Sequence, residues 1–433
     1  MRKFTLLTAI ATCSLTAGAA VITPGEAINR ITASGDMAKV RGMSGQRLRL
    51  VDTRSIDAEP AIYVFANGES GYVFATADDT TAPLLGYVES GSYDPDNLPP
   101  ALVFYLDDAA AQVEWARTEA SKQSLKSNSP LRVQHANYAE IQPMVKTQWN
   151  QSTPFNNMCP EIDGERCVTG CVATALAQVI AYHKYPVNGT GSKSYTWTSG
   201  STSTTLSYDY STANFDWANM LDTYDGTYTE TQANAVANLM YACGVGVEMD
   251  YGINGSGAAT AQSANVLRDY LGYRKDIHSE SRSYYDILGW DELVYNQLRD
   301  FGPVQFSGSN NEGGHSFVCD GYRPGGYYHF NWGWGGMSDG YFLLTALDPT
   351  SQGIGGSSAG YNFNVAIIAN VAPDPDGTAP EYYAITCDGL TVSAESCPLG
   401  GSVTIQNFMA NSSSVTLTGS VGMQVKAKAQ DGL

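Results

Sequence analysis

The sequence predicts an α+β protein in which a helical half faces an antiparallel sheet half. Between residues 138 and 373 the helical patterns come first and the strand patterns follow, an order that is typical of the α+β class. A further α+β unit precedes this region, and a partial all-β module follows it. With 433 residues and 43% hydrophobic content, the chain is long enough for two or three folded domains. We predict four consecutive segments, with boundaries at 1–20, 21–135, 136–373 and 374–433.

Residues 1–20 have the features of a secretory signal peptide. Arg2 and Lys3 give a charged start, residues 4–15 are apolar or small, and the Ala-Gly-Ala run at 17–19 provides a small-x-small cleavage pattern. No later stretch is long and apolar enough to span a bilayer. We therefore expect a protein that leaves the cytoplasm and has no membrane span. It would be secreted, with the periplasm or the cell surface as alternatives.

Residues 21–135 are predicted to form the first α+β unit. The segments 61–65 and 72–75 are rich in β-branched and aromatic residues and indicate strands. A helix is predicted over 101–121, where alanine and leucine favour helical structure. The polar stretch 121–137 then indicates an exposed linker that a protease could cut.

Residues 136–373 contain the elements on which the fold class depends. The helices are predicted at 171–185, 229–243 and 261–271. The strands are predicted at 304–306, 316–318, 327–330 and 341–344. Turn residues at 373–377 mark a linker. Beyond it, 390–392 and 402–405 alternate like strands of a β-sandwich, but the segment is too short for a whole one.

The composition excludes several classes of partner and cofactor. The net charge of -19 argues against binding to nucleic acid or to anionic membranes. None of the eight cysteines forms a C-x-x-C pair, so we expect no structural zinc, no other metal and no cofactor. In an oxidising compartment Cys159 with Cys167, or Cys387 with Cys397, could each close a small loop. The sequence leaves these pairings open.

Cys171 is the candidate nucleophile. It follows Gly170 at the start of a helical pattern, with Thr169 as the expected N-cap and Pro186 after the helix. The positive end of a helix and its free N–H groups favour the thiolate, which is the reactive form of cysteine. A lone cysteine is more often a packed core residue, so the helix alone does not choose between these two interpretations.

Among the five histidines, His315 is the candidate base. Gly313 and Gly314 precede it and leave room for a substrate, and the strand pattern after it would hold the ring rigidly. A base on a strand that faces a thiol on a helix is the geometry that nucleophilic catalysis needs. His183, in contrast, falls on the apolar stripe of its helix, and we expect it to be a core residue.

Asn331 and Trp332 follow His315 by sixteen and seventeen positions, in the run Asn-Trp-Gly-Trp-Gly-Gly. The Asn331 amide could accept a hydrogen bond from one ring N–H of His315 and fix its tautomer. Trp332 could cover that hydrogen bond and exclude water. The alternative is an aromatic-glycine turn that only packs the sheet.

The candidates occur in the order Cys, His, Asn, which is the order of papain-like peptidases. In detail, the chain resembles the streptopain-like family of papain-fold cysteine peptidases over about residues 60–372, without the C-terminal tail. The matching stretches are 150–156, 169–178, 182–186, 249–252, 313–321 and 328–340, with 85–87 and 90–92 in the first unit. The resemblance implies a papain-like fold preceded by a propeptide.

The resemblance also implies a role for each matching residue. Cys171 matches the nucleophile and His315 the general base and acid. Asn331 matches the residue that orients the histidine, and Trp332 the shield beside it. Gln151 matches the side chain that forms the oxyanion hole with the backbone N–H of Cys171. An amide N–H₂ is a neutral donor that suits negative charge developing on oxygen.

Two further residues, Ser256 and Gly314, resemble substrate-contacting positions of the family. The loop at 252–259 departs from the family form in length, which weakens the match for Ser256. The implied specificity is a preference for hydrophobic side chains two residues before the cut.

The implied function is that of a bacterial thiol endopeptidase, secreted as an inactive zymogen and acting on proteins or peptides. Residues 21–135 would be its inhibitory propeptide, and the alternative is a separate binding domain that stays attached. Two other functions remain open. A papain-like amidase or transglutaminase more often has Asp or His in place of Asn331. A non-enzymatic adhesin on a protease scaffold would be expected to have lost site residues that this chain retains.

Overall fold

The computed structural model of the chain describes residues 21–35, 48–68, 71–123, 138–310, 313–346, 365–383, 385–392 and 404–411, with three single positions after them. The predicted signal peptide and most of the predicted linker at 121–137 lie outside the described residues. Of the helices that are described, none combines the length and the apolar character needed to cross a bilayer.

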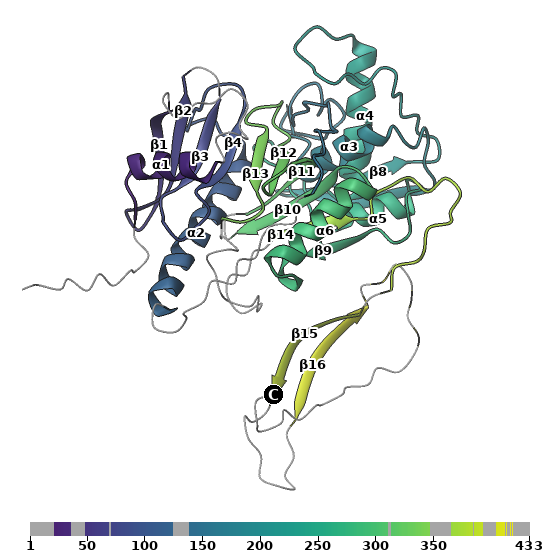
Figure 1. Ribbon diagram of the computed structural model, residues 1–433. Helices are drawn as coiled ribbons and strands as arrows, with labels where there is room; N and C mark the ends of the chain where they lie inside the picture. Colours follow the sequence, from purple (N-terminus) through teal and green to yellow (C-terminus); the bar gives the residue numbers. More distant parts are fainter. Residues whose placement is uncertain are drawn as a thin grey trace, which may run out of the picture.

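A ten-stranded sheet runs through the structure (Figure 1). In order across the sheet, its strands are β1 (Leu48–Ile56), β2 (Glu59–Asn67), β3 (Tyr72–Thr76), β4 (Leu84–Val88), β13 (Gly340–Leu343), β12 (Tyr327–Asn331), β11 (Gly313–Arg323), β10 (Val304–Asn310), β14 (Val365–Ala369) and β9 (His278–Ser281). All neighbouring strands are antiparallel, as the sequence predicts. The six strands predicted before residue 373 correspond to β2, β3 and β10–β13, whereas β1, β4, β9 and β14 were missed.

The first α+β unit shares this sheet with the later region. Strand β4 pairs with β13, with Tyr87 opposite Tyr341 and Gly86 opposite Phe342. A Cβ atom at Gly86 would lie 2.3 Å from Phe342 Cδ1 and 2.8 Å from the Tyr341 carbonyl oxygen. Only glycine therefore allows this close approach. The two units that the sequence predicts separately form one continuous sheet.

Helices α1 (Pro24–Ser34) and α2 (Pro100–Gln123) cover opposite faces of β1–β4. Because side chains alternate along a strand, Val64 joins the core under α2, and its neighbour Phe65 joins the core under α1. Helix α2 corresponds to the helix predicted over 101–121. It also reaches β10 and β11, so the first unit lies over the face of the sheet that carries the candidate base.

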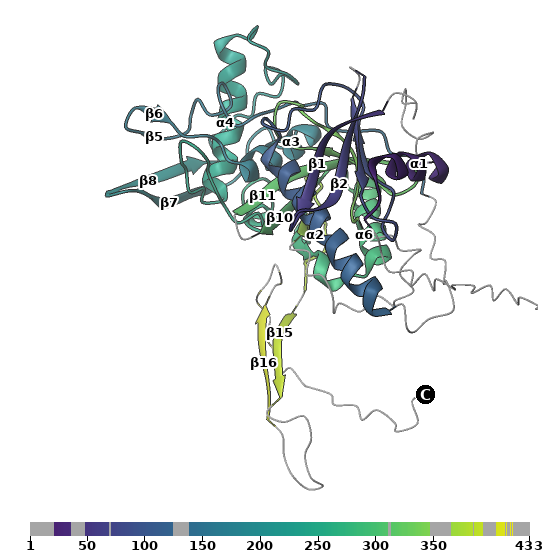
Figure 2. The same ribbon diagram turned by 90° about the vertical axis from the view of Figure 1, so that its left-hand side faces the viewer.

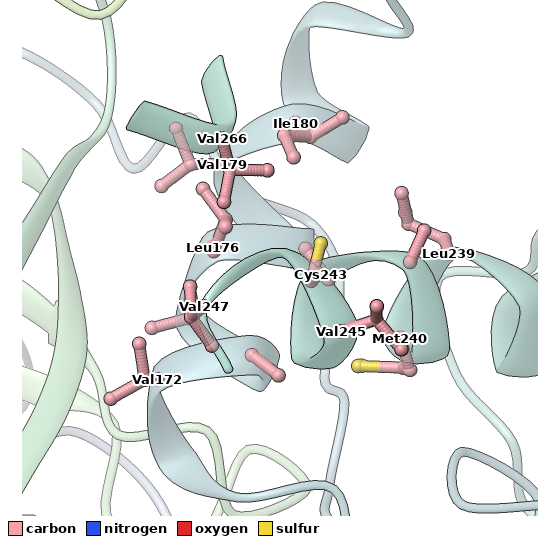
Figure 3. Packing of buried hydrophobic residues seen from close by; sticks show 14 of the residues in the cluster. Val172, Leu176, Val179, Ile180, Leu239, Met240, Cys243, Val245, Val247 and Val266 are labelled. Atoms are coloured by element: carbon pink, nitrogen blue, oxygen red, sulfur yellow. The ribbon is translucent and has the colours of Figure 1, made fainter. Parts of the chain in front are cut away.

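The helical half packs on the other face of β11. Its helices are α3 (Cys171–His183), α4 (Glu230–Gly246) and α5 (Gln262–Asp269). Val318 of β11 joins their core, whereas Phe317 joins the core formed with α2 and α6 (Ile287–Asp300). Figure 3 shows apolar side chains of α3 and α4 in this core, with Val266 of α5 near Val179 of α3. The sequence predicts α3, α4 and α5 but not α6.

Small hairpins complete the described structure. β5 (Glu161–Ile162) pairs with β6 (Glu165–Arg166), and β7 (Ser192–Ser199) pairs with β8 (Thr202–Asp209) at the edge of the helical half (Figure 2). β15 (Ile385–Val392) and β16 (Ile405–Asn411) form a two-stranded hairpin apart from the main sheet (Figure 1). This hairpin agrees with the β-rich tail that the sequence predicts.

Candidate active site

Cys171 is the first residue of α3, and Gly170 holds it there. Gly170 has φ +85°, and a Cβ atom in its place would lie 2.8 Å from Met249 Sδ and 2.9 Å from the Ser256 carbonyl oxygen. The N-cap is therefore Gly170, whereas the sequence predicts Thr169. Thr169 instead shares a 2.8 Å hydrogen bond with Thr174 through their hydroxyl groups. The glycine lets the backbone turn sharply into the helix.

The thiol of Cys171 lies against strand β11. Burial raises its pKa, and the backbone N–H groups of Ser316, Val172 and Cys171 itself act in the opposite direction by hydrogen bonding to the thiolate. Ser316 directly follows His315. The fold therefore brings the start of α3 to the strand that carries the candidate base, although 144 residues separate Cys171 from His315.

A buried glutamine ties α3 to this strand. Gln305 of β10 donates through Nε2 to the Val172 carbonyl, at 3.2 Å, and to Ser316 Oγ, at 3.0 Å. Ser316 Oγ in turn donates to the Phe306 carbonyl at 2.9 Å. These hydrogen bonds join the start of the helix to β10 and β11 next to the two candidate residues.

His315 lies opposite Gly308 of β10, under helix α2. Its ring centroid is 6.0 Å from that of Phe104. A Cβ atom at Gly308 would lie only 2.1 Å from Phe104 Cε1, so the phenyl ring fills the space above the glycine. Burial lowers the pKa of His315. Burial thus opposes the charged form of both Cys171 and His315, and so disfavours an ion pair between them.

Asn331 does not make the hydrogen bond to His315 that the sequence suggested. Its Oδ1 accepts from Gln178 Nε2 and from the Gly333 N–H, each at 3.0 Å. Its Nδ2 donates to the Thr147 carbonyl at 2.8 Å. In the β11–β12 register Asn331 lies opposite Val318, three residues beyond His315. This register places the amide away from the imidazole ring.

Trp332 is buried in the aromatic core on the α2 side of the sheet. Its ring lies 5.0 Å from Phe317 and 5.9 Å from Tyr105 of α2, centroid to centroid. Its Nε1 donates to the Ser338 carbonyl at 2.9 Å. Phe317 is two residues after His315 on the same face of β11, so Trp332 supports the strand next to the candidate base.

The remaining candidates lie close in sequence or by hydrogen bond to Cys171 and His315, and they are Gln151, Ser256 and Gly314. The Gln151 carbonyl accepts from the Thr169 N–H at 3.0 Å, which fixes its segment beside the start of α3. Ser256 Oγ donates to the Val168 carbonyl at 2.7 Å and accepts from the Gly252 N–H at 3.0 Å. The hydroxyl of Ser256 thus closes its own loop. Gly314 precedes His315 on β11 and is exposed.

Sequence reasoning missed Phe104 and Gln178. Phe104 carried no signal of its own, because its partner Gly308 is about 200 residues away. Gln178 did carry one, as a long polar side chain between Ala177 and Val179 in a mostly apolar helix, seven positions after Cys171. Among the described residues, no group of three or more His, Cys, Asp or Glu side chains could hold a metal ion.

The packing of α3 against β11, with the helical half on one face of the sheet, is that of a papain-like cysteine peptidase. A model of the Peptidase C10 family matches residues 149–342, and a model described as Spi protease inhibitor matches residues 26–113. Streptopain of Streptococcus pyogenes is 33% identical over 336 residues, which cover 72% of this chain and 81% of the relative.

Two further comparisons agree. A fragment of Prevotella intermedia prointerpain A is 34% identical with a TM-score of 0.63, and the match covers 76% of this chain and 99% of the fragment. The thiol protease/hemagglutinin PrtT of Porphyromonas gingivalis is 30% identical over 375 residues, which cover 83% of this chain and 42% of that protein.

The chain belongs to the Peptidase C10 family. It is a cysteine endopeptidase precursor whose N-terminal unit is an inhibitor propeptide. Family membership thus favours the peptidase over the amidase, transglutaminase and adhesin alternatives. It also favours a propeptide over a permanently attached binding domain.

Proposed function

We propose that the protein is a secreted bacterial endopeptidase that cleaves peptide bonds through Cys171 and His315 and removes its own propeptide. The proposal rests on one observation above all. The thiol of Cys171 lies against the backbone N–H of Ser316, the residue after His315. The signal-like segment at 1–20 supports secretion.

In the assembled site, His315 takes the proton from the Cys171 thiol. The thiolate attacks the carbonyl carbon of the peptide, and the electron pair of the C=O bond moves to the oxygen. The Gln151 amide and the Cys171 N–H hold this oxyanion. The C–N bond then breaks, His315 protonates the leaving amine, and an acyl-enzyme remains. Water, activated by His315, hydrolyses the acyl-enzyme and restores the thiol.

The remaining site residues position this machinery. Trp332 supports the strand that carries His315. Asn331 fixes the turn that begins at Gly333, from whose N–H it accepts a hydrogen bond, and joins it to Thr147. Ser256 and Gly314 would contribute backbone rather than side-chain contacts to the substrate, since the Ser256 hydroxyl is engaged within its own loop. A substrate strand could run past Gly314, where no side chain obstructs it.

Latency follows from the position of helix α2. Phe104 covers the His315 ring, and β4 occupies the edge of β13. Tyr105 Oη donates to the Leu343 carbonyl at 2.7 Å, which adds a polar contact between the propeptide and the catalytic region. Burial under α2 disfavours the imidazolium form of His315, which an ion pair with Cys171 requires. Departure of α2 would expose His315 and raise its pKa towards the ordinary value.

We propose that maturation cuts the chain between residues 121 and 141, which would separate a 21–135 propeptide from a 136–373 catalytic domain. Tyr138 stacks on Tyr295, 4.1 Å between ring centroids, and the Ile141 N–H donates to the Tyr322 carbonyl at 2.9 Å. The chain is thus packed on the catalytic region from Tyr138 onward, which supports a cut before that residue. The segment after 373 would remain as a β-rich module.

The test is expression of three single variants of the full precursor, which carry Cys171→Ala, His315→Ala or Cys243→Ala. The first two should accumulate as uncut precursor and leave casein intact, because self-processing needs both groups. Cys243 is a buried thiol of the α3–α4 core, so its variant should process itself and cut casein, provided a reductant is present. A thiol-reactive epoxide should label the wild type at Cys171 alone. If Cys171→Ala matures normally by itself, the proposal fails.

A further inference from the structure

Gln178 connects three chain segments that each carry a proposed site residue. It lies on α3, seven residues after Cys171, which is two helical turns and about 10 Å along the axis. Its side chain is fully buried. A buried amide is costly unless its polar atoms are hydrogen-bonded, so its partners explain why an apolar helix carries it.

Both ends of the Gln178 amide are engaged. Oε1 accepts from Thr147 Oγ1 at 2.9 Å and from the Trp149 N–H at 3.4 Å. Nε2 donates to Asn331 Oδ1 at 3.0 Å. Asn331 Nδ2 donates back to the Thr147 carbonyl at 2.8 Å, which closes a ring of hydrogen bonds. We call Thr147, Gln178 and Asn331 the buried amide cluster.

The cluster lies between the segments that carry the proposed catalytic groups. Trp149 is two residues before Gln151, and the helix of Gln178 begins with Cys171. Asn331 ends β12, next to the strand of His315, and its Oδ1 also accepts from the Gly333 N–H. The Gly335 N–H donates to the Trp149 carbonyl at 3.0 Å, which joins the same two segments a second time.

We propose that Gln178 is a positioning residue that sets the distance between Gln151 and the Cys171 N–H, the two donors of the oxyanion hole. This inference rests on the proposed function, because it assigns those donors to the same site. The hydrogen bonds of Gln178 have one geometry, whereas an apolar side chain would let the three segments slide. Displacement of a catalytic group by about 1 Å can cost about 100-fold in rate.

The first test measures how firmly the buried amide cluster holds the two segments beside it, and it does not depend on enzyme activity. In the Cys171→Ala background every precursor stays whole, and hydrogen exchange can be followed for the backbone amides of residues 147–151 and 331–335. Gln178→Leu should speed their exchange at least tenfold. The control is Gln297→Leu. Gln297 is a buried glutamine of helix α6, and its amide forms two hydrogen bonds with Asn370, away from the buried amide cluster. The control variant should leave both segments within twofold of wild type.

The second test separates positioning from thiol activation. Precursors with an intact Cys171 are matured by tagged wild-type enzyme, which is then removed. Gln178→Leu should lower kcat for a peptide substrate about 100-fold with KM within threefold, because the lost alignment acts on the transition state. Alkylation of Cys171 by iodoacetamide needs no oxyanion hole and should stay within threefold of wild type.

A milder pair of variants covers the case in which Gln178→Leu does not fold. Thr147→Val removes one hydrogen bond of the cluster and keeps the side-chain shape, so it should lower kcat, and Thr147→Ser should restore it. Unchanged exchange of both segments in Gln178→Leu and Thr147→Val overturns the inference. So does an equal loss of alkylation and kcat. If wild-type enzyme cleaves no peptide, the proposed function fails, and the exchange measurement alone still decides the role of Gln178.

Discussion

Replacement of Phe104 by alanine should release the precursor from latency. Phe104 is 5% exposed, and its ring lies over His315 and Gly308, both in the catalytic region. Truncation of a buried phenylalanine costs about 3–5 kcal/mol. Because the contacts of this ring are on the catalytic side, most of the loss falls on docking of the propeptide. About 3 kcal/mol corresponds to a roughly 100-fold shift towards the undocked state.

The assay is the time course of precursor conversion at fixed pH and in the presence of a reductant, followed by gel and by casein cleavage. Phe104→Ala should convert much faster than wild type, and Phe104→Leu should be intermediate. The matched control is Asp107→Ala on the same helix, which removes a partly exposed ion pair with Arg54, and such a pair contributes at most about 1 kcal/mol. A folded Phe104→Ala precursor that converts no faster than Asp107→Ala would refute the role given to this ring.

Three other substitutions test the packing and the charges. Gly86→Val should separate β4 from β13, since its side chain would collide with Phe342 and the Tyr341 carbonyl, and should lower the melting temperature of the precursor while the mature enzyme is unchanged. Burial raises the pKa of Asp108 on α2 to about 6, so protonation favours the docked form and docking weakens as pH rises through 6. Asp108→Asn should therefore slow conversion at pH 7.5, and the effect should shrink as the pH falls from 6 towards 4, where the undocked carboxyl is also protonated. Burial lowers the pKa of His183 to about 4, so the stability that its neutral form contributes is present above about 6.5 and is lost as pH falls towards 4. Denaturant unfolding should show about 2 kcal/mol less pH-dependent loss between pH 7 and 4.5 in His183→Gln than in wild type.

The elements that the sequence predicted well are those with strong local patterns. Helix α3 combines an apolar stripe with a glycine start, and the predicted strands β10–β13 are dense in aromatic and β-branched residues. In the missed strands β1 and β9 every position is exposed or half-buried, so neither strand shows an alternating buried face. Such strands acquire their conformation from the neighbour with which they pair, and no local pattern indicates that neighbour.

The sequence supplied candidate site residues but not their arrangement. Asn331 was expected beside His315 because its amide could fix the tautomer of the histidine, but the β11–β12 register sets it against Val318. Its amide then meets Gln178 of α3, 153 residues earlier. A shift in register of one residue would turn the side chains of the strand to the other face, so sequence order alone cannot fix such contacts.

The sequence by itself determined the chemistry that this protein can perform. A thiol at a helix start, a glycine-flanked histidine and a glutamine upstream are identities and spacings, and they can be read without coordinates. The tertiary structure alone decided that β4 joins β13, that Phe104 covers His315, and that Gln178 holds Asn331. These contacts join residues far apart in the chain, and they form because side chains must fill space and buried polar groups must find partners in the folded protein.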